Sequence, residues 1–272
     1  MLRFRYWVLV LLISIVSCSP NKEQKQEESV VESTSPTLTW AEEFDYSGTP
    51  NENIWGYREG GHGWGNNELQ NYTTRSENVV VENGNLVITA VKEDYEGSEY
   101  TSAAVLTYGK QDFQYGRIEV RAKLPGGRGT WPAIWLLGNS IREGTRWPDC
   151  GEIDIMENVG FDPDTVHANV HTQSYNHILG TNKGDQIYVP DIDAYHVYAI
   201  EWYEERIDFF IDEQKYFTYR RESDDPAVWP FSKPHYLILN LAIGGNWGGQ
   251  EGVDDSIFPR KFYVDYVRYY EL

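Results

Sequence analysis

Apolar and polar residues alternate along most of this chain from about residue 37 to the C-terminus. Successive side chains of a β-strand point to opposite faces, so such alternation predicts strands with one buried and one exposed face. Two adjoining runs, 206–212 and 213–217, predict a hairpin. The clearest single runs are residues 85–91, 116–123, 165–172, 195–202 and 262–270.

Turn-forming residues separate these runs, and no long stretch keeps the period of a helix. One short helical turn is expected around residues 224–228, where Pro226 suits a first helical position. The pattern therefore predicts an all-β fold, an antiparallel β-sandwich. We assign it to a single domain over residues 37–272.

Three acids interrupt the apolar pattern in Gly-Glu-Ile-Asp-Ile-Met-Glu-Asn at residues 151–158. In a strand, Glu152 and Asp154 share one face, whereas strict alternation would send Glu157 to the apolar face. An unpaired carboxylate buried there would cost several kcal/mol. A β-bulge at Ile155 and Met156 would return Glu157 to the face of the other acids, and bulges are common beside active sites.

A line of carboxyls on a rigid strand suits hydrolysis of a glycosidic bond. One carboxyl must be ionised to attack the anomeric carbon and the other must hold a proton, and crowding of like charges helps to separate their pKa values. The alternative is a calcium site or a solvated edge strand, because perturbed carboxylates are often structural.

Residues 147–160, which contain the three acids, closely resemble the catalytic strand of family 16 glycoside hydrolases, in the laminarinase (endo-β-1,3-glucanase) branch. The resemblance implies a jelly-roll sandwich with a concave cleft that cleaves β-glucan with retention and without a catalytic cofactor. It also implies Glu152 as nucleophile, Asp154 as its helper and Glu157 as acid/base. Further matching segments are residues 63–70, 129–136 and 239–247, so that the resemblance runs from about Leu38 to the C-terminus.

Other functions remain open. The same fold would suit a mixed-linkage β-1,3-1,4-glucanase or a galactanase. A non-catalytic glycan-binding lipoprotein has no need of both Glu152 and Glu157, and a purely structural envelope lipoprotein leaves the aligned acids and tryptophans unexplained.

Five tryptophans and one amide are candidate substrate contacts. Trp64 and Asn66 lie in a glycine-rich stretch that lets the backbone approach a ligand, although a loop without a ligand would look alike. Trp131 and Trp135 share a strand face and would stack on sugars in a groove, or would simply be core residues. Trp147 is a weaker candidate, and so is Trp247.

His167, Asn169, His171 and Gln173 share the polar face of a predicted strand. A catalytic zinc would need a third clustered ligand, which the sequence does not clearly supply. We therefore expect hydrogen bonds to sugar or to the catalytic carboxylates, with His171 as the stronger candidate and His167 as a satisfied wall residue.

The resemblance also implies a structural calcium ion, held by Asp265 and the backbone carbonyls of Glu43 and Gly84. Hard oxygen ligands suit calcium. The alternative is that Asp265 faces solvent or caps a turn.

A formal net charge of −19 argues against nucleic acid and anionic membrane surfaces, which attract basic faces. It argues more weakly against a sulfated polysaccharide and leaves a neutral β-glucan as the expected partner. Aromatic residues make up 15% of the chain, enough for both a sandwich core and sugar stacking. We expect a monomer.

The N-terminal segment is expected to be a lipoprotein signal peptide over residues 1–18, because two arginines and a short apolar run precede a lipobox ending at Cys18. The alternative is an ordinary secretory signal. Residues 19–36 are polar and predict a flexible linker. The protein would be an exported bacterial lipoprotein, periplasmic or on the cell surface, attached to the membrane only through lipid. Cys150 is expected to be a small packed residue.

Overall fold

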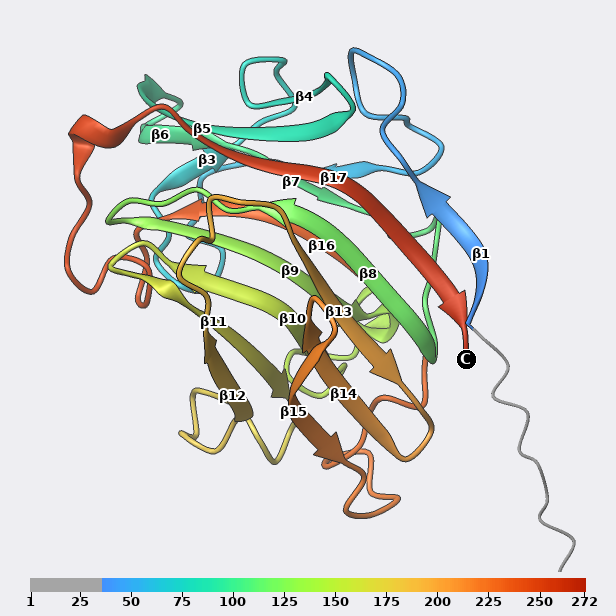
Figure 1. The fold of residues 1–272 in the computed structure, drawn as a ribbon. Helices are drawn as coiled ribbons and strands as arrows, with labels where there is room; N and C mark the ends of the chain where they lie inside the picture. Colours follow the sequence, from blue (N-terminus) through green and yellow to red (C-terminus); the bar gives the residue numbers. More distant parts are fainter. Residues whose placement is uncertain (1–35) are drawn as a thin grey trace, which may run out of the picture. The chain divides into compact units, whose positions relative to one another are not determined.

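The computed structural model describes residues 36–272, and these residues form two β-sheets packed face to face (Figure 1). The cleft sheet, named for the site that it carries, has seven strands in the order β12-β11-β10-β9-β16-β7-β2. Their bounds are β12 Lys183–Tyr188, β11 Asp162–His171, β10 Glu152–Val159, β9 Thr130–Gly138, β16 His235–Ile243, β7 Ala104–Leu106 and β2 Gly56–Arg58.

The outer sheet has ten strands, eight of them in the order β15-β14-β13-β8-β17-β5-β6-β3, with β1 beside β17 and β4 beside β5. Their bounds are β15 Gln214–Arg220, β14 Arg206–Ile211, β13 His196–Trp202, β8 Gly116–Lys123, β17 Arg260–Glu271, β5 Asn85–Tyr95, β6 Ser98–Ser102, β3 Gln70–Tyr72, β1 Thr37–Glu42 and β4 Val79–Glu82. The alternating runs of the sequence thus lie in strands, and the predicted all-β sandwich is confirmed.

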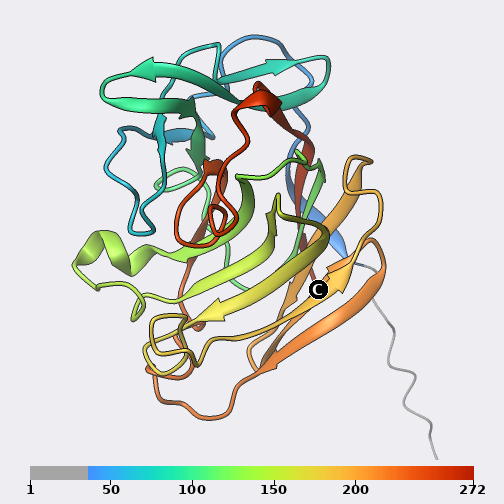
Figure 2. The ribbon, with the colours of Figure 1, turned by 90° about the vertical axis from the view of Figure 1, so that its left-hand side faces the viewer.

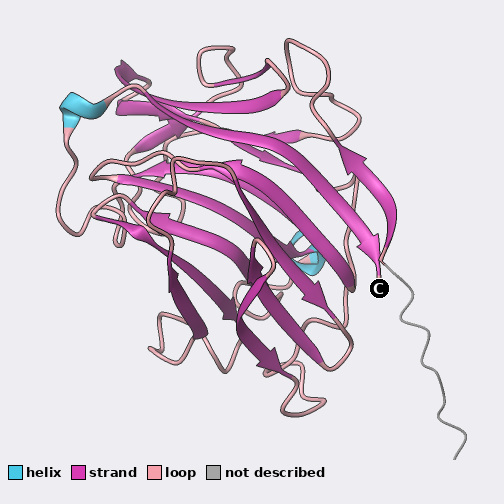
Figure 3. Cartoon of the chain, viewed as in Figure 1, coloured by secondary structure: helices cyan, strands magenta, loops and turns pink. Residues whose placement is uncertain are grey.

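Pairing between strands is antiparallel except between β3 and β6, which run parallel in the part of the chain that the structure describes. The described helices are two short 3-10 turns, η1 (Asn139–Glu143) and η2 (Asp255–Ile257), shown in cyan in Figure 3. Figure 2 shows η1, in yellow-green, projecting beside the strands of the cleft sheet. None of the helices within residues 36–272 is long and apolar enough to cross a membrane.

The short helical turn predicted around residues 224–228 forms as a single turn and does not continue into a helix. The amides of Val228 and Trp229 both donate to the Asp225 carbonyl oxygen, at 2.9 and 2.8 Å. Asp225 Oδ1 also accepts from the Ala227 amide at 2.9 Å, a local bond that competes with a continuing helix. Pro230 follows, and the residue before a proline disfavours the helical conformation.

The core lies between the two sheets, where apolar side chains from alternate strand positions meet. Ile153, Ile155 and Met156 of β10 are fully buried in it. Burying side chains of this size stabilises the fold by about 1.5–3 kcal/mol each. Cys150 packs at 2% exposure in a smaller cluster beside the core, as expected, and burial raises the pKa of its thiol to about 12.

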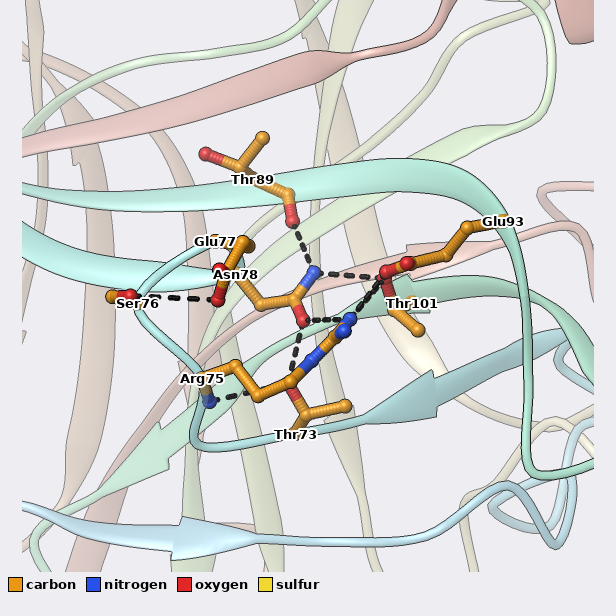
Figure 4. Close-up of polar contacts among 8 residues, drawn as sticks. All are labelled: Thr73, Arg75, Ser76, Glu77, Asn78, Thr89, Glu93 and Thr101. Carbon is orange, nitrogen blue, oxygen red and sulfur yellow. Dashed lines mark hydrogen bonds and ion pairs between the residues drawn. The ribbon is translucent and has the colours of Figure 1, made fainter.

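A polar network fixes the loop that leaves β3 against β5 and β6 (Figure 4). Arg75 Nη2 donates to Asn78 Oδ1 at 3.0 Å and to Thr101 Oγ1 at 3.2 Å, and it pairs with Glu93. Asn78 Nδ2 donates to Thr101 Oγ1 at 2.9 Å and to the Thr89 carbonyl at 3.1 Å. Buried polar groups are stable only when paired, so these bonds hold in place the end of the sandwich beside the glycine-rich loop.

Residues 1–35 lie outside the described residues. The predicted signal peptide, the predicted lipidation site Cys18 and almost all of the predicted linker belong to them.

Candidate active site

Strand β10 contains the predicted β-bulge. Asp154 pairs with Trp135 of β9, and the next pair is Met156 with Ile134, so two steps on β10 match one step on β9. The extra residue brings Ile155 and Met156 into the core together and turns Glu157 away from it. The bulge that the acid pattern predicted is confirmed.

The three acids of β10 face a cleft with a volume of about 840 Å³. Its floor comes from the cleft sheet and its walls from the loops around residues 58–68, 147, 177–182 and 246–250. The seven predicted substrate-contacting residues all line it, namely Trp64, Asn66, Trp131, Trp135, Trp147, His171 and Trp247. Polar residues that were not predicted as substrate contacts line it too, among them Arg58, Glu68, His177, Asn182 and Asn240.

Two tryptophans hold the outer carboxyls of the acid strand. Trp147 Nε1 donates a hydrogen bond to Glu152 Oε2, and Trp131 Nε1 donates one to Glu157 Oε1, both at 3.0 Å. Asn169 of β11 donates to the other oxygen of Glu157 at 3.3 Å. Charge-assisted bonds of this kind orient a carboxylate and stabilise its charged form.

His171 lies opposite Glu152 in the pairing of β10 and β11. Its Nε2 is 3.3 Å from Asp154 Oδ2 and 3.8 Å from Glu152 Oε1. The three donor atoms lie within 4.8 Å of one another, so a metal ion is a geometric possibility. A metal ion there would need both acids ionised, whereas burial favours their protonated forms.

His167 differs from the satisfied wall residue that the sequence predicted. Its ring meets Trp247 edge-on with the ring centroids 4.9 Å apart, and its Nε2 is buried without a hydrogen-bond partner. Burial lowers the pKa of the imidazole below its usual value. His167 lines the cleft, and the hydrogen-bonding capacity of its buried Nε2 is unmet.

The three carboxyls all have raised pKa values. Burial is the main cause for Glu152, and the nearby charge of Asp154 adds to it, raising the pKa to about 8. Burial and the charge of Glu157 raise the pKa of Asp154 well above its usual value, and burial raises that of Glu157. A proton on Asp154 removes its repulsion of Glu152, so the order in which the protons leave is set by the whole cluster.

The glycine-rich loop is built into the cleft wall. Trp64 adopts a positive φ of 48° and its indole donates to the Gly60 carbonyl at 3.0 Å. Asn66 Nδ2 donates to Glu68 Oε1 at 3.4 Å. Burial raises the pKa of Glu68, whose other oxygen accepts from Gln70 at 2.6 Å. These bonds order the loop, and Trp64 and Asn66 both line the cleft, where a ligand could reach them.

Trp135 is held from the opposite side. Its Nε1 donates to Asn240 Oδ1 at 2.7 Å, and the guanidinium of Arg58 lies 4.9 Å from the centre of its ring. Asn240 Nδ2 donates to the hydroxyl of Tyr72 at 3.1 Å. Trp131 and Trp135 both line the cleft, so neither is a core tryptophan.

The predicted calcium ligands lie on the far side of the outer sheet from this cleft, on and beside β17 and β5. Arg121 Nη1 donates to Asp265 Oδ2, while the Glu43 carboxylate pairs with Arg268. Arg121 leaves the second carboxyl oxygen of Asp265 free. This oxygen and the backbone carbonyls of Glu43 and Gly84 are hard ligands of the kind that calcium prefers. Arg121 already pairs with Asp265, so a calcium ion would have to share that carboxylate, and calcium stays a prediction.

The chain is similar to known proteins over most of its length. The sequence model of glycosyl hydrolases family 16 matches residues 66–268. A β-glucanase of Rhodothermus marinus is 55% identical over 241 residues, which are 86% of this chain and 84% of that protein.

Two solved structures are also similar. A laminarinase of Rhodothermus marinus has a TM-score of 0.85 and 53% identity, covering 87% of this chain and 98% of that one. A non-specific endo-β-1,3(4)-glucanase co-crystallised with 1,3-β-D-cellotriosyl-glucose has a TM-score of 0.84 and 45% identity, covering 88% of this chain and 96% of that one.

Proposed function

The chain belongs to family 16 of the glycosyl hydrolases, and from this premise we propose that it is a retaining endo-β-1,3-glucanase acting on laminarin-type β-glucan. The observation that carries the proposal is the pair Glu152 and Glu157, held by indole donors on one face of a bulged strand inside a tryptophan-lined cleft. Two carboxyls so placed supply both functions that glycosidic hydrolysis needs.

In the first step, Glu152 attacks the anomeric carbon while Glu157 gives its proton to the leaving oxygen. The glycosidic C–O bond breaks, and a glycosyl ester of Glu152 forms. In the second step Glu157, now ionised, takes a proton from water, whose oxygen displaces Glu152 from the anomeric carbon. Two inversions leave the configuration unchanged.

The environment of each acid suits its role. Trp147 donates to Glu152 and so favours the carboxylate that must attack. The side chain of Asp154 is 4% exposed and that of Glu152 is 15% exposed, so burial favours the protonated form of Asp154 more strongly. A protonated Asp154 carries no charge and does not repel the carboxylate of Glu152. Burial favours the protonated form of Glu157, while the donors Trp131 and Asn169 stabilise its charge once the proton has left.

Substrate binding is assigned to Trp64, Asn66, Trp131, Trp135, Trp147, His171 and Trp247, which line the cleft. Indole rings present apolar faces to pyranose rings, and amide or imidazole groups bond hydroxyls.

Reducing-sugar release from curdlan, laminarin, lichenan and agarose tests the proposal. We expect the fastest release from laminarin. The second candidate is mixed-linkage cleavage, favoured by the similarity to a non-specific endo-β-1,3(4)-glucanase, and it predicts comparable release from lichenan. Faster release from agarose would indicate a galactanase, and release from none of the four would contradict a hydrolytic role.

We propose two further properties that do not take part in the chemistry. Lipid on Cys18 would anchor the exported domain to a membrane, as the lipobox pattern supports. A calcium ion held by Asp265 and the carbonyls of Glu43 and Gly84 would stabilise the fold without entering the reaction.

A further inference from the structure

A second hollow of about 440 Å³ adjoins the cleft at the edge strand β12. It shares His167, Asn169 and Asn182 with the cleft, so the two form one continuous surface. The remaining lining residues are Gly184, Asp185 and Gln186. In Figure 1, β12 lies beside β11 at the margin of the cleft sheet. None of these β12 residues takes part in the chemistry assigned to Glu152 and Glu157.

The strand pairing shows which β12 side chains share the cleft face. Gly184 lies opposite Asn169, and Gln186 lies opposite His167. Ile187 packs against the core, so Gln186 and Tyr188 on either side of it point the other way, toward the cleft face. The cleft face therefore continues along β12 in a row that ends at Tyr188.

Tyr188 is 69% exposed, although it is one of the large hydrophobic side chains. An exposed ring at the end of a row of amide side chains combines an apolar face with hydrogen-bonding groups. His167 lies opposite Gln186, and its Nε2 is buried and unpaired, which costs free energy until a ligand or water supplies a partner. Two groups here thus lack a partner within the protein: the ring of Tyr188 could stack on a sugar, and His167 Nε2 could bond a hydroxyl.

The charges of the row select against anionic ligands. Asp185, which alternates with the cleft-facing positions 184 and 186, borders the hollow, and the chain carries a net charge of −19. Lys183 is the lysine of this strand, but its ammonium group lies 4.5 Å from the centre of the Tyr175 ring and outside the hollow. A sulfated or uronic acid chain would meet repulsion here, whereas the hydroxyls of a neutral sugar would not.

We propose that the cleft-facing side of β12, from Asn182 to Tyr188, binds additional sugar units of a neutral glucan chain that continues out of the cleft. This inference rests on the proposed glucanase function and deepens it. Tyr188 stacks on one sugar ring, and Gln186, Asn182 and His167 bond the hydroxyls of neighbouring sugar units. Short oligosaccharides end before β12 and do not use the site.

The test is kcat/KM for purified β-1,3-gluco-oligosaccharides of increasing length and for laminarin. Tyr188→Ala and Gln186→Ala should match the wild type on the shortest cleaved substrates. On long ones their kcat/KM should fall about three- to tenfold through KM, the effect of losing one net contact. Tyr188→Phe, which keeps the ring, should retain most of the wild-type value.

Tyr108→Ala is the matched control, since this ring is also exposed but follows β7, near the opposite end of the cleft sheet from β12. It should have no length-dependent effect. Equal losses at every length, or no loss at any length, would overturn the inference while leaving the glucanase function intact. Failure of the wild type to cleave any of these substrates would instead overturn the proposed function, and this inference with it.

Discussion

Replacing Trp147 by phenylalanine should shift the pH dependence of the reaction in one direction. The variant keeps a six-membered ring but loses the Nε1–H that donates to Glu152 Oε2 at 3.0 Å. A hydrogen bond to a charged group contributes about 1.5–3 kcal/mol, and each pKa unit corresponds to about 1.4 kcal/mol. The bond stabilises the carboxylate, so its loss raises the pKa of Glu152 by about one to two units.

Because Glu152 must be ionised to attack, the acidic limb of the kcat/KM profile should move to higher pH by that amount. In the wild type this limb should already lie above the usual pKa of a glutamate, since burial raises the pKa of Glu152. The assay is the initial rate of laminarin hydrolysis across pH at substrate concentrations well below KM.

Two matched variants separate this effect from a general loss of aromatic packing. Trp131→Phe removes the donor to Glu157, which must carry a proton, so the basic limb should move to higher pH while the acidic limb stays. Trp135→Phe removes a donor to Asn240 alone and should move neither limb. An unchanged acidic limb in Trp147→Phe, or equal shifts in all three variants, would refute the assigned carboxylate contacts.

Three further predictions concern stability and anchoring. Chelation of calcium should lower Tm with little change in the rate at room temperature, because an ion bound only to the folded state stabilises it; loss of activity from a protein that stays folded would place the metal in the active site. Cys18→Ala should release an active soluble domain or block maturation, and unchanged membrane retention of a correctly processed variant would contradict the anchor. Met156→Ala, at a fully buried bulge position, should cost about 2–5 kcal/mol in chemical denaturation, and a loss under about 0.5 kcal/mol would mean that the bulge does not depend on this packing.

The sequence predicted the strands because alternation is a local property of the chain. It also predicted the bulge, since a carboxylate at Glu157 has few other ways to leave the apolar layer. Ile155 and Met156 are both buried as that argument requires. The short turn at residues 224–228 was predicted from a favourable first helical position, and one aspartate side chain and a following proline keep it from continuing as a helix.

Contacts between distant segments could not be predicted, because they depend on strand register. Trp131 was expected to stack on sugar, but its indole also binds Glu157, a contact set by the bulged pairing of β9 and β10. Asn240 lies in the segment 239–247 that resembles the family, so its place at the site could have been predicted from the sequence. Arg58 carried no such signal, and its place over Trp135 follows only from the folded chain.

The most direct test of the central claim is azide rescue of the two glutamate variants with an aryl β-glycoside that has a good leaving group. In Glu157→Ala, the glycosyl-enzyme should still form, because this leaving group needs no proton, but its breakdown should be slow. Azide needs no general base and should displace Glu152 to give a β-glycosyl azide. In Glu152→Ala, azide should replace the nucleophile and give the α-azide in a single inversion.

The configuration of each product, determined by proton NMR, assigns the two roles independently of rate. The β-azide from Glu157→Ala together with the α-azide from Glu152→Ala is the predicted result. The opposite products would exchange the roles of the two glutamates. If neither variant is rescued and both still hydrolyse laminarin, the carboxyls of β10 are not the catalytic groups.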